Sequence, residues 1–260
     1  MAGQPQYPVY IISKGRAFNP LTAKHFQREG IPFLIAVEPQ EADEYAKAVG
    51  RDSLLVLPFA NLGLGSYPAR NHCWEHAKAA GNAYHWILDD NILHWRKWVN
   101  GFRAKWDKIH DAFSYVESYT NRNHVDIAGF EEYNFCPRPT KKPFKRNCHV
   151  YSAMLIKSSL PYRWRLKYNE DVDLCLQVLH DGGTTASCMY YLQNKVSTSA
   201  KMKGGNQTDL YQGNDPRKKL LKAKMLEAVW PQYAKTVIRF NRYHHLVDWK
   251  VFQKKLSSQP

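Results

Sequence analysis

A short hydrophobic run in the middle of the chain stops abruptly at two adjacent carboxylates, and no other feature constrains the fold as strongly. The run is Tyr84 to Leu88, and Asp89, Asp90 and Asn91 follow it directly. Such a run predicts a buried strand with acidic side chains at its carboxyl end. In open α/β sheets ligands bind at that edge, where clustered oxygen atoms suit Mg²⁺ or Mn²⁺ with a phosphorylated substrate. These residues predict a metal-assisted transferase that uses a nucleotide-diphosphate donor.

Strand-like and helix-like segments alternate on both sides of this run. The expected strands are residues 7–13, 33–37, 53–57, 125–130, 150–156 and 184–192. The expected helices are residues 21–29, 41–49, 109–121, 171–180 and 217–230, with one more that ends near residue 80. This alternation predicts an α/β fold, a doubly wound and mostly parallel central sheet flanked by helices.

The chain is expected to form one domain, because neither an internal repeat nor a clear boundary divides its 260 residues. Residues of about 7–130 would form the nucleotide-binding half, and about 131–260 the acceptor half with a C-terminal tail. The polar, glycine-containing segment 196–215 predicts a mobile loop.

The charge of the chain favours a polyanionic partner. Lys and Arg total 37 against 23 acidic residues, a net charge of +14, which is more than solubility requires. Solvated surface lysines are the plain alternative, but the cations are clustered and mixed with aromatic residues that can stack on bases. The candidate DNA-binding residues are Arg96, Lys97, Trp98, Arg103, Lys105, Trp106, Arg138, Lys141, Lys142, Lys145 and Arg146.

The rest of the composition excludes several classes of protein. No apolar run approaches the ~20 residues of a membrane-spanning helix, and the first residues lack the layout of a signal peptide. The five cysteines show no CxxC spacing, so neither a disulfide framework nor a cysteine zinc site is predicted. We expect a soluble protein of the cytoplasm with no membrane partner.

A second acidic group, Asn169-Glu170-Asp171, stands at the start of a predicted helix. Acidic residues there often only cap a helix and complement its dipole. Combined with the Asp89-Asp90 strand end, however, they supply a general base for an acceptor hydroxyl. Asp171 is the first candidate and Glu170 the second.

Two further sets of residues are candidates for holding the donor and a metal ion. Polar residues leave the first predicted strand, and a glycine-rich loop leads into a helix whose N–H groups suit a diphosphate. The candidate donor-binding residues are Ser13, Lys14, Arg16, Gly65, Arg70, Asn71, Asp89 and Asp90. The candidate metal ligands, a mixed oxygen and imidazole set, are Asp90, Asn91 and His245. For the cations and His245 the alternative is an ordinary surface role.

The motifs, and the order in which they occur along the chain, resemble those of glycosyltransferases of the GT-A type. The resemblance covers about residues 7–192 and rests on the polar exit of the first strand, Gly65 to Asn71, Leu88 to Asn91, and Asn169 to Asp171. It implies a GT-A-like, Rossmann-like fold, a nucleotide-sugar donor that is usually a uridine diphosphate (UDP) sugar, and a divalent metal at the Asp-rich motif. It also implies an acidic base at Asp171 and inversion at the sugar carbon. Asn91 fills the third position of the family's Asp-x-Asp pattern, which leaves open whether Asp90 or Asn91 faces the ion.

The Asp-Asp-Asn motif in a short basic chain is further similar to the phage TET-associated glycosyltransferases. This resemblance implies sugar transfer to 5-hydroxymethylcytosine in DNA, in the host cytoplasm if the chain is phage-encoded. A DNA acceptor agrees with the charge of +14, and its target base would have to leave the stack. The rival hypotheses are a saccharide, lipid or protein acceptor, a DNA-binding protein with an inactive transferase site, and a nucleotidyltransferase.

Overall fold

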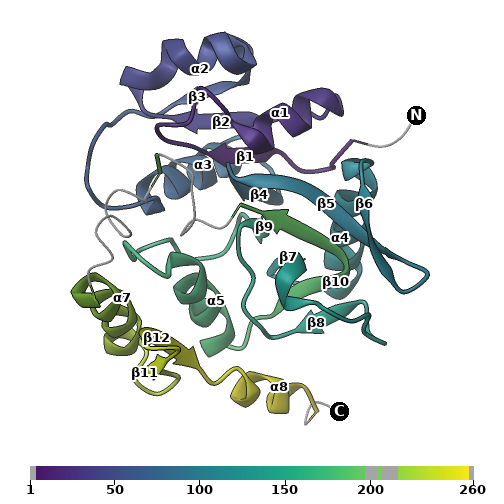
Figure 1. Ribbon diagram of the computed structural model, residues 1–260, viewed down its shortest axis with the longest axis vertical. Helices are drawn as coiled ribbons and strands as arrows, with labels where there is room; N and C mark the ends of the chain where they lie inside the picture. Colours follow the sequence, from purple (N-terminus) through teal and green to yellow (C-terminus); the bar gives the residue numbers. More distant parts are fainter. Residues whose placement is uncertain (1–3, 197–203, 206–215, 258–260) are drawn as a thin grey trace.

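The structure is a computed structural model that describes residues 4–196, 204–205 and 216–257 (Figure 1). Most of the segment predicted as a mobile loop lies outside these residues. Within them a ten-stranded sheet runs in the order β3-β2-β1-β4-β9-β7-β10-β5-β6, with β8 paired to β10. Helices pack against this sheet, so the predicted α/β class is confirmed.

The first half of the sheet is the predicted run of alternating strands and helices. Parallel pairing joins β1 to β2 and β4, and β2 to β3. The strands are β1 (Val9–Ile12), β2 (Leu34–Val37), β3 (Leu54–Val56) and β4 (Tyr84–Asp89). The helices are α1 (Leu21–Arg28), α2 (Ala42–Val49) and α3 (Tyr67–Ala79). Because β1 and β4 are adjacent and parallel, their carboxyl ends meet at one edge.

The second half of the sheet mixes strand directions. Its strands are β5 (Ile92–Val99), β6 (Phe102–Trp106), β7 (Ile127–Glu132), β8 (Phe144–Arg146), β9 (Ala153–Lys157) and β10 (Thr185–Lys195). The helices here are α4 (Ile109–Asn123) and α5 (Glu170–His180). Among the described strands of this sheet, β5, β8 and β9 run against the other seven, so the sheet is mostly parallel.

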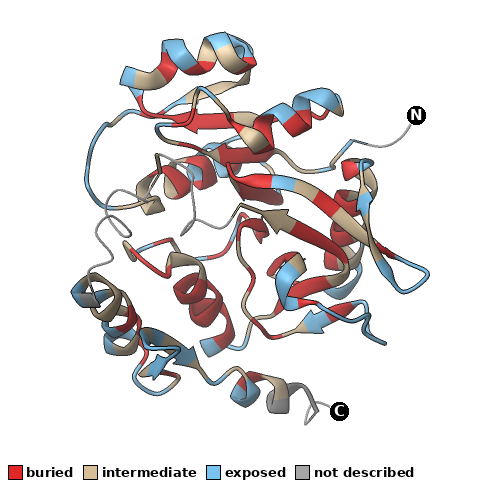
Figure 2. Ribbon diagram, in the orientation of Figure 1, coloured by how far each residue is buried: buried red, intermediate tan, exposed pale blue. Residues whose placement is uncertain are grey.

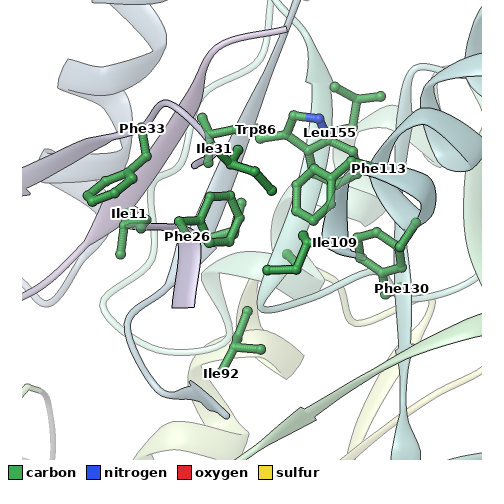
Figure 3. Close-up of a cluster of buried hydrophobic side chains, with 14 of the residues drawn as sticks. Ile11, Phe26, Ile31, Phe33, Trp86, Ile92, Ile109, Phe113, Phe130 and Leu155 are labelled. Carbon is green, nitrogen blue, oxygen red and sulfur yellow. The ribbon is translucent and has the colours of Figure 1, made fainter. Parts of the chain in front are cut away.

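Aromatic side chains fill the core between the sheet and the helices. Trp86 of β4 stacks on Phe130 with ring centroids 5.6 Å apart, and Phe113 of α4 lies 4.4 Å from the Trp86 ring (Figure 3). Phe26 of α1 meets Phe113 edge to face. Trp86, Phe113 and Phe26 are fully buried. This packing anchors β4 and therefore positions the carboxylates at its end.

The C-terminal elements form a separate layer at the opposite end of the molecule from α1 and α2 (Figure 1). They are α7 (Pro216–Val229), β11 (Ala234–Arg239), β12 (Arg242–Val247) and α8 (Lys250–Ser257). A small apolar cluster that includes Leu176, Leu226 and Phe252 joins this layer to α5. The β11–β12 hairpin pairs antiparallel as its own two-stranded sheet. The sequence predicted neither this hairpin nor the one formed by β5 and β6.

Within the described part of the chain, no helix combines the length and apolar character that a membrane crossing requires.

Candidate active site

A cavity of ≈ 800 Å³ opens where the carboxyl ends of β1 and β4 face the start of α5. Both predicted acidic groups line it. Its walls include Asp89 and Asp90 on one side, and Glu170 and Asp171 on the other. The C-terminal layer contributes His245 and Trp249 to the same cavity.

Asp89 lies at the end of β4 between two cations. Arg70 donates from Nη2 to Asp89 Oδ1 at 2.7 Å, and Lys195 Nζ lies 3.7 Å from Oδ2. Burial by itself raises the pKa of the Asp89 carboxyl, but the charges of Arg70 and Lys195 outweigh it, so that pKa is lowered. Asp89 is therefore an anion that holds two cations at the strand end.

Asp90 is almost fully buried, and its two oxygens are both engaged. The Arg16 guanidinium forms an ion pair with Oδ1, and the Ser13 hydroxyl donates to Oδ2 at 2.5 Å. Burial raises the pKa of the Asp90 carboxyl, and Arg16 only partly opposes it. Arg16 also donates to the Gly204 carbonyl at 3.1 Å. The polar exit of β1 is thus built around Asp90, a pairing that the sequence did not predict.

The predicted metal ligands do not assemble into a metal centre. The oxygens of Asp90 are bound by Arg16 and Ser13. His245 instead lies close enough to Lys222 and Asp171 for their charges to affect its pKa. Asn91 donates to the Val196 carbonyl at 3.0 Å, and its Oδ1 is buried without a hydrogen-bond partner. Across the described residues no group of three or more His, Cys, Asp or Glu side chains is arranged to hold an ion. Because Mg²⁺ in proteins is commonly held by one or two carboxylates and both oxygens of Asp90 are already engaged by Arg16 and Ser13, the predicted set does not form a preformed metal site.

Arg70 connects the two acidic groups. Its Nε donates to Ser66 Oγ at 3.0 Å, and Ser66 Oγ in turn donates to Glu170 Oε1 at 2.7 Å. Arg70 Nε also lies 3.6 Å from Glu170 Oε1. Burial raises the pKa of the Glu170 carboxyl, and the neighbouring charge of Asp171 acts in the same direction against Arg70.

The loop before α3 requires glycine at position 65, because the backbone of Lys167 lies very close to it. Gly65 has φ +81°, and a Cβ added there would lie 2.7 Å from the Lys167 carbonyl oxygen. Any other residue would therefore push this loop away from the segment that leads into α5. Gly65 thus brings α3, with Arg70 in its first turn, against the start of α5.

Asp171 is paired with a histidine that the sequence did not single out. His149 Nε2 lies 3.1 Å from Asp171 Oδ2, and the Val172 N–H donates to Asp171 Oδ1 at 2.8 Å. Burial would raise the pKa of the Asp171 carboxyl, but His149 outweighs it and holds that pKa well below its usual range. The His149 ring lies parallel to Trp249 at 5.9 Å and stacks with Tyr151 at 4.8 Å. His149 carried no sequence signal, because Asp171 and Trp249 come from two other segments.

His245 lies on β12 and faces the cavity. Burial, with the charge of Lys222, lowers its pKa to about 4. The imidazole is therefore neutral near pH 7.

Two predicted donor-binding residues have different roles in the structure. Both polar groups of the Asn71 side chain bind the backbone of Trp164, at 2.7 and 3.0 Å, and Asn71 does not line the cavity. This corrects the prediction for Asn71, which is structural. Lys14 lines the cavity but donates to both oxygens of Glu38 at 2.7 Å.

The first predicted DNA-binding cluster forms the β5–β6 hairpin, where most of its members bind the protein itself. Lys97 Nζ lies 3.9 Å from the centre of the Trp106 ring. Arg96 donates to the Arg103 carbonyl, and Arg103 donates to the Tyr133 carbonyl. Because Trp98 is buried, it cannot stack on a base, and that prediction is corrected. Lys105 is exposed and lies 3.1 Å from Asp107.

The second predicted cluster is more open. Arg138, Lys141, Lys142 and Lys145 are exposed, and Arg146 is half-buried. Lys145 also lines the cavity. Of this cluster, Lys145 on β8 places a cation in the cavity lining, whereas β5 and β6 contribute no residue to it.

A family model described as TET-Associated Glycosyltransferase matches residues 7–205. No curated protein matches the chain. Among solved structures, one from Desulfovibrio desulfuricans G20 is provisionally assigned as a nucleotide-diphospho-sugar transferase. It is 10% identical with a TM-score of 0.36, over 66% of this chain and 75% of that chain, and at this similarity it carries no argument about the site.

Proposed function

Because this chain belongs to the TET-associated glycosyltransferase family, we propose that it transfers a sugar from a UDP-sugar to 5-hydroxymethylcytosine in DNA. The chain is a glycosyltransferase by family. The donor, the acceptor and the residue roles are the proposal. The observation that carries it is that one cavity holds a cation-rich strand end and a separate acidic helix start, joined by Arg70.

The donor diphosphate is proposed to bind at the strand end. Arg16, Arg70 and Lys195 already lie around Asp89 and Asp90, and such cations stabilise the charge that develops on a departing diphosphate. Asp89 and Asp90 hold these cations in place and offer oxygens to ribose or sugar hydroxyls. The positive charge at this end favours departure of the nucleoside diphosphate.

The acceptor hydroxyl is proposed to bind beside α5. Asp171 takes the proton of the hydroxymethyl group while its oxygen attacks the anomeric carbon. The new bond joins that oxygen to the sugar, and the bond between the anomeric carbon and the diphosphate oxygen breaks. Attack from the side opposite the diphosphate inverts the anomeric centre. His149 orients the Asp171 carboxylate by its contact at 3.1 Å.

Glu170 is the second candidate for the base. Its raised pKa makes it the stronger base of the two acidic residues when ionised, but Ser66 and Arg70 occupy Oε1. Asp171 has the weaker basicity and the more open position, with side-chain exposures of 29% against 14% for Glu170. Separate Asp171→Asn and Glu170→Gln variants discriminate between them, because removal of the true base lowers turnover by roughly 10²–10⁴-fold.

The test is incubation of the protein with hydroxymethylated DNA and a panel of UDP-sugars, followed by nucleoside mass analysis. A mass gain equal to one sugar residue on 5-hydroxymethylcytosine, absent on unmodified cytosine, is the expected result. Asp43→Asn is the matched control for Asp171→Asn, because Asp43 is a helix carboxylate 82% exposed on its side chain. Transfer only to a saccharide, lipid or protein would overturn the acceptor assignment.

The same assay with and without Mn²⁺ tests how the leaving group is stabilised. Because Arg16, Arg70 and Lys195 already surround the carboxylates, transfer is expected to continue in a chelator. A strict requirement for Mn²⁺ would overturn the proposal that these three cations by themselves stabilise the leaving group.

A further inference from the structure

The β11–β12 hairpin ends in an aromatic side chain that the fold does not bury. Phe240, at the turn, is 92% exposed, and Ile238 beside it is 66% exposed. Figure 2 shows this hairpin in the colours of exposed and intermediate residues, in contrast to the buried strands of the main sheet. The Phe240 side chain adds nothing to the core of this chain, and together with Ile238 it makes the tip apolar.

The backbone at the tip is also unfavourable for phenylalanine. Phe240 and Asn241 have φ of +49° and +58°, the left-handed pair of a two-residue hairpin turn. Asn or Gly is the favoured residue at the first of these positions, and a bulky side chain there is an outlier. Since Phe240 is almost fully exposed, contacts within the chain do not repay this conformational cost.

The C-terminal part of the chain that carries this tip is strongly basic. Residues 216–260 contain eleven Lys and Arg and two acidic residues, so they carry nine of the fourteen net positive charges of the chain. Arg239 and Arg242 flank the turn and are exposed, as is Lys235 at the start of β11. An exposed aromatic residue between two arginines suits a duplex, where the ring stacks between bases and the guanidinium groups bind phosphates.

The hairpin is connected directly to the candidate active site. His245, on the same strand as Arg242, lines the cavity, and so does Trp249 just beyond β12. The five residue steps from His245 to Phe240 span about 17 Å along an extended strand. The hairpin therefore runs from the rim of the cavity outward, and its tip can contact DNA whose target nucleotide enters that cavity. It lies outside residues 7–205, which the family model matches.

We infer that the β11–β12 hairpin is a DNA wedge, with Phe240 inserted into the base stack beside the target cytosine and Arg239 and Arg242 on the flanking phosphates. This inference rests on the proposed function, because a base inside a duplex must leave the stack to reach an enclosed site. An inserted apolar side chain separates neighbouring bases and fills the space that the flipped base leaves. The wedge thus assists extrusion, and the cavity receives the base.

The decisive variant is Phe240→Asn, which favours the observed turn and so leaves the hairpin folded. On hydroxymethylated duplex DNA, kcat/KM is expected to fall by about tenfold or more, because unstacking is no longer assisted. On the same strand without its complement the change is expected to stay within about twofold. Placing an abasic site opposite the target should restore the activity of the variant, since that base is already unpaired.

Phe102→Asn is the matched control, because Phe102 stands just after the turn of the β5–β6 hairpin and is 76% exposed. It is expected to behave like the wild type on both substrates. Equal activity of Phe240→Asn and the wild type on duplex DNA would overturn the wedge, as would a loss confined to Phe102→Asn. An equal loss of Phe240→Asn activity on single-stranded DNA would overturn it too, because a wedge acts only on a stack.

A second measurement separates failure of the wedge from failure of the proposed function. In an unmodified duplex with 2-aminopurine next to the target position, fluorescence is expected to rise when the wild type binds, but not when Phe240→Asn binds. If the wild type transferred no sugar to any DNA, the proposed function would fail while this signal still decided the wedge. The absence of any fluorescence rise with wild-type protein bound to the duplex would overturn the wedge.

Discussion

Two hairpins of this protein carry basic and aromatic residues, yet their cations are placed in opposite ways. In β5–β6, Lys97 lies over the Trp106 ring and Arg103 donates to the Tyr133 carbonyl. In β11–β12, Arg239 and Arg242 point to solvent beside an exposed Phe240. A hairpin cation that is held over a ring or by a carbonyl contributes less to DNA binding than one that points to solvent, because leaving its contact offsets part of what it gains.

The turns of the two hairpins sharpen this contrast. The β5–β6 turn is Asn100-Gly101, with φ of +49° and +81°, the residues that such a turn favours. The β11–β12 turn has the same left-handed pair at Phe240-Asn241. The residues of the β5–β6 turn therefore stabilise its conformation, whereas Phe240 destabilises that of the β11–β12 turn. Such a local conflict is expected in a segment that acts on another molecule.

The largest effect is expected from removing a cation that is fully committed to contacts within the protein. Arg70 of α3 is such a cation. Arg70→Met removes a buried cation, leaves the half-buried Asp89 with one cation fewer, and removes the contact with Glu170. The free energy of unfolding is expected to fall by about 3–5 kcal/mol, because breaking a buried ion pair leaves an uncompensated charge. Urea unfolding measures this change. Arg51→Met, whose pair with Asp43 is exposed on both sides, should change it by less than about 1 kcal/mol.

A histidine buried in the sheet should make the stability of the protein depend on pH. His85 of β4 is fully buried, and burial lowers its pKa to about 3. Below pH ~6.5 the unfolded chain binds a proton that the folded chain excludes, so stability falls as pH falls. His85→Gln should therefore remove about 2 kcal/mol of the loss in unfolding free energy between pH 6.5 and 5.

The salt dependence of DNA binding also distinguishes the two hairpins, with a smaller expected effect than the changes in stability. Arg239→Gln with Arg242→Gln should reduce the slope of log affinity against log salt by about 2, close to one for each phosphate contact. Fluorescence anisotropy with unmodified duplex DNA, at several salt concentrations, measures this slope. An unchanged slope in the double variant would remove these arginines from the interface.

The smallest effect is expected at the matching cation of β5–β6. Lys97→Met keeps an apolar stem over Trp106 but loses the charge that lies 3.9 Å from the ring centre. The unfolding free energy should fall by about 0.5–1 kcal/mol, and the salt slope should not change. If the slope fell by about one instead, Lys97 would leave the Trp106 ring to bind DNA, and the contrast between the hairpins would break.

Much of the fold could be predicted because its signals are local. The apolar runs and glycine stops around β1, α1, β2, α2 and β4 are contained in short windows of sequence, and the strands and helices lie where those windows place them. The hairpins escaped prediction because the basic and aromatic residues of β5–β6 were interpreted as a binding groove. The strands β11 and β12 have mixed polarity, which gives little periodic signal.

The sequence by itself determined the α/β alternation, the acidic end of β4 and the acidic start of α5, since each depends on neighbouring residues. Only the tertiary structure decided how these residues pair. Arg16 meets Asp90 across 74 positions, and His149 reaches Asp171 from a different segment. It also decided which cations remain exposed. The physical reason is that local pattern sets burial and periodicity, whereas the pairing of charges depends on distances between segments that only the packed sheet brings together.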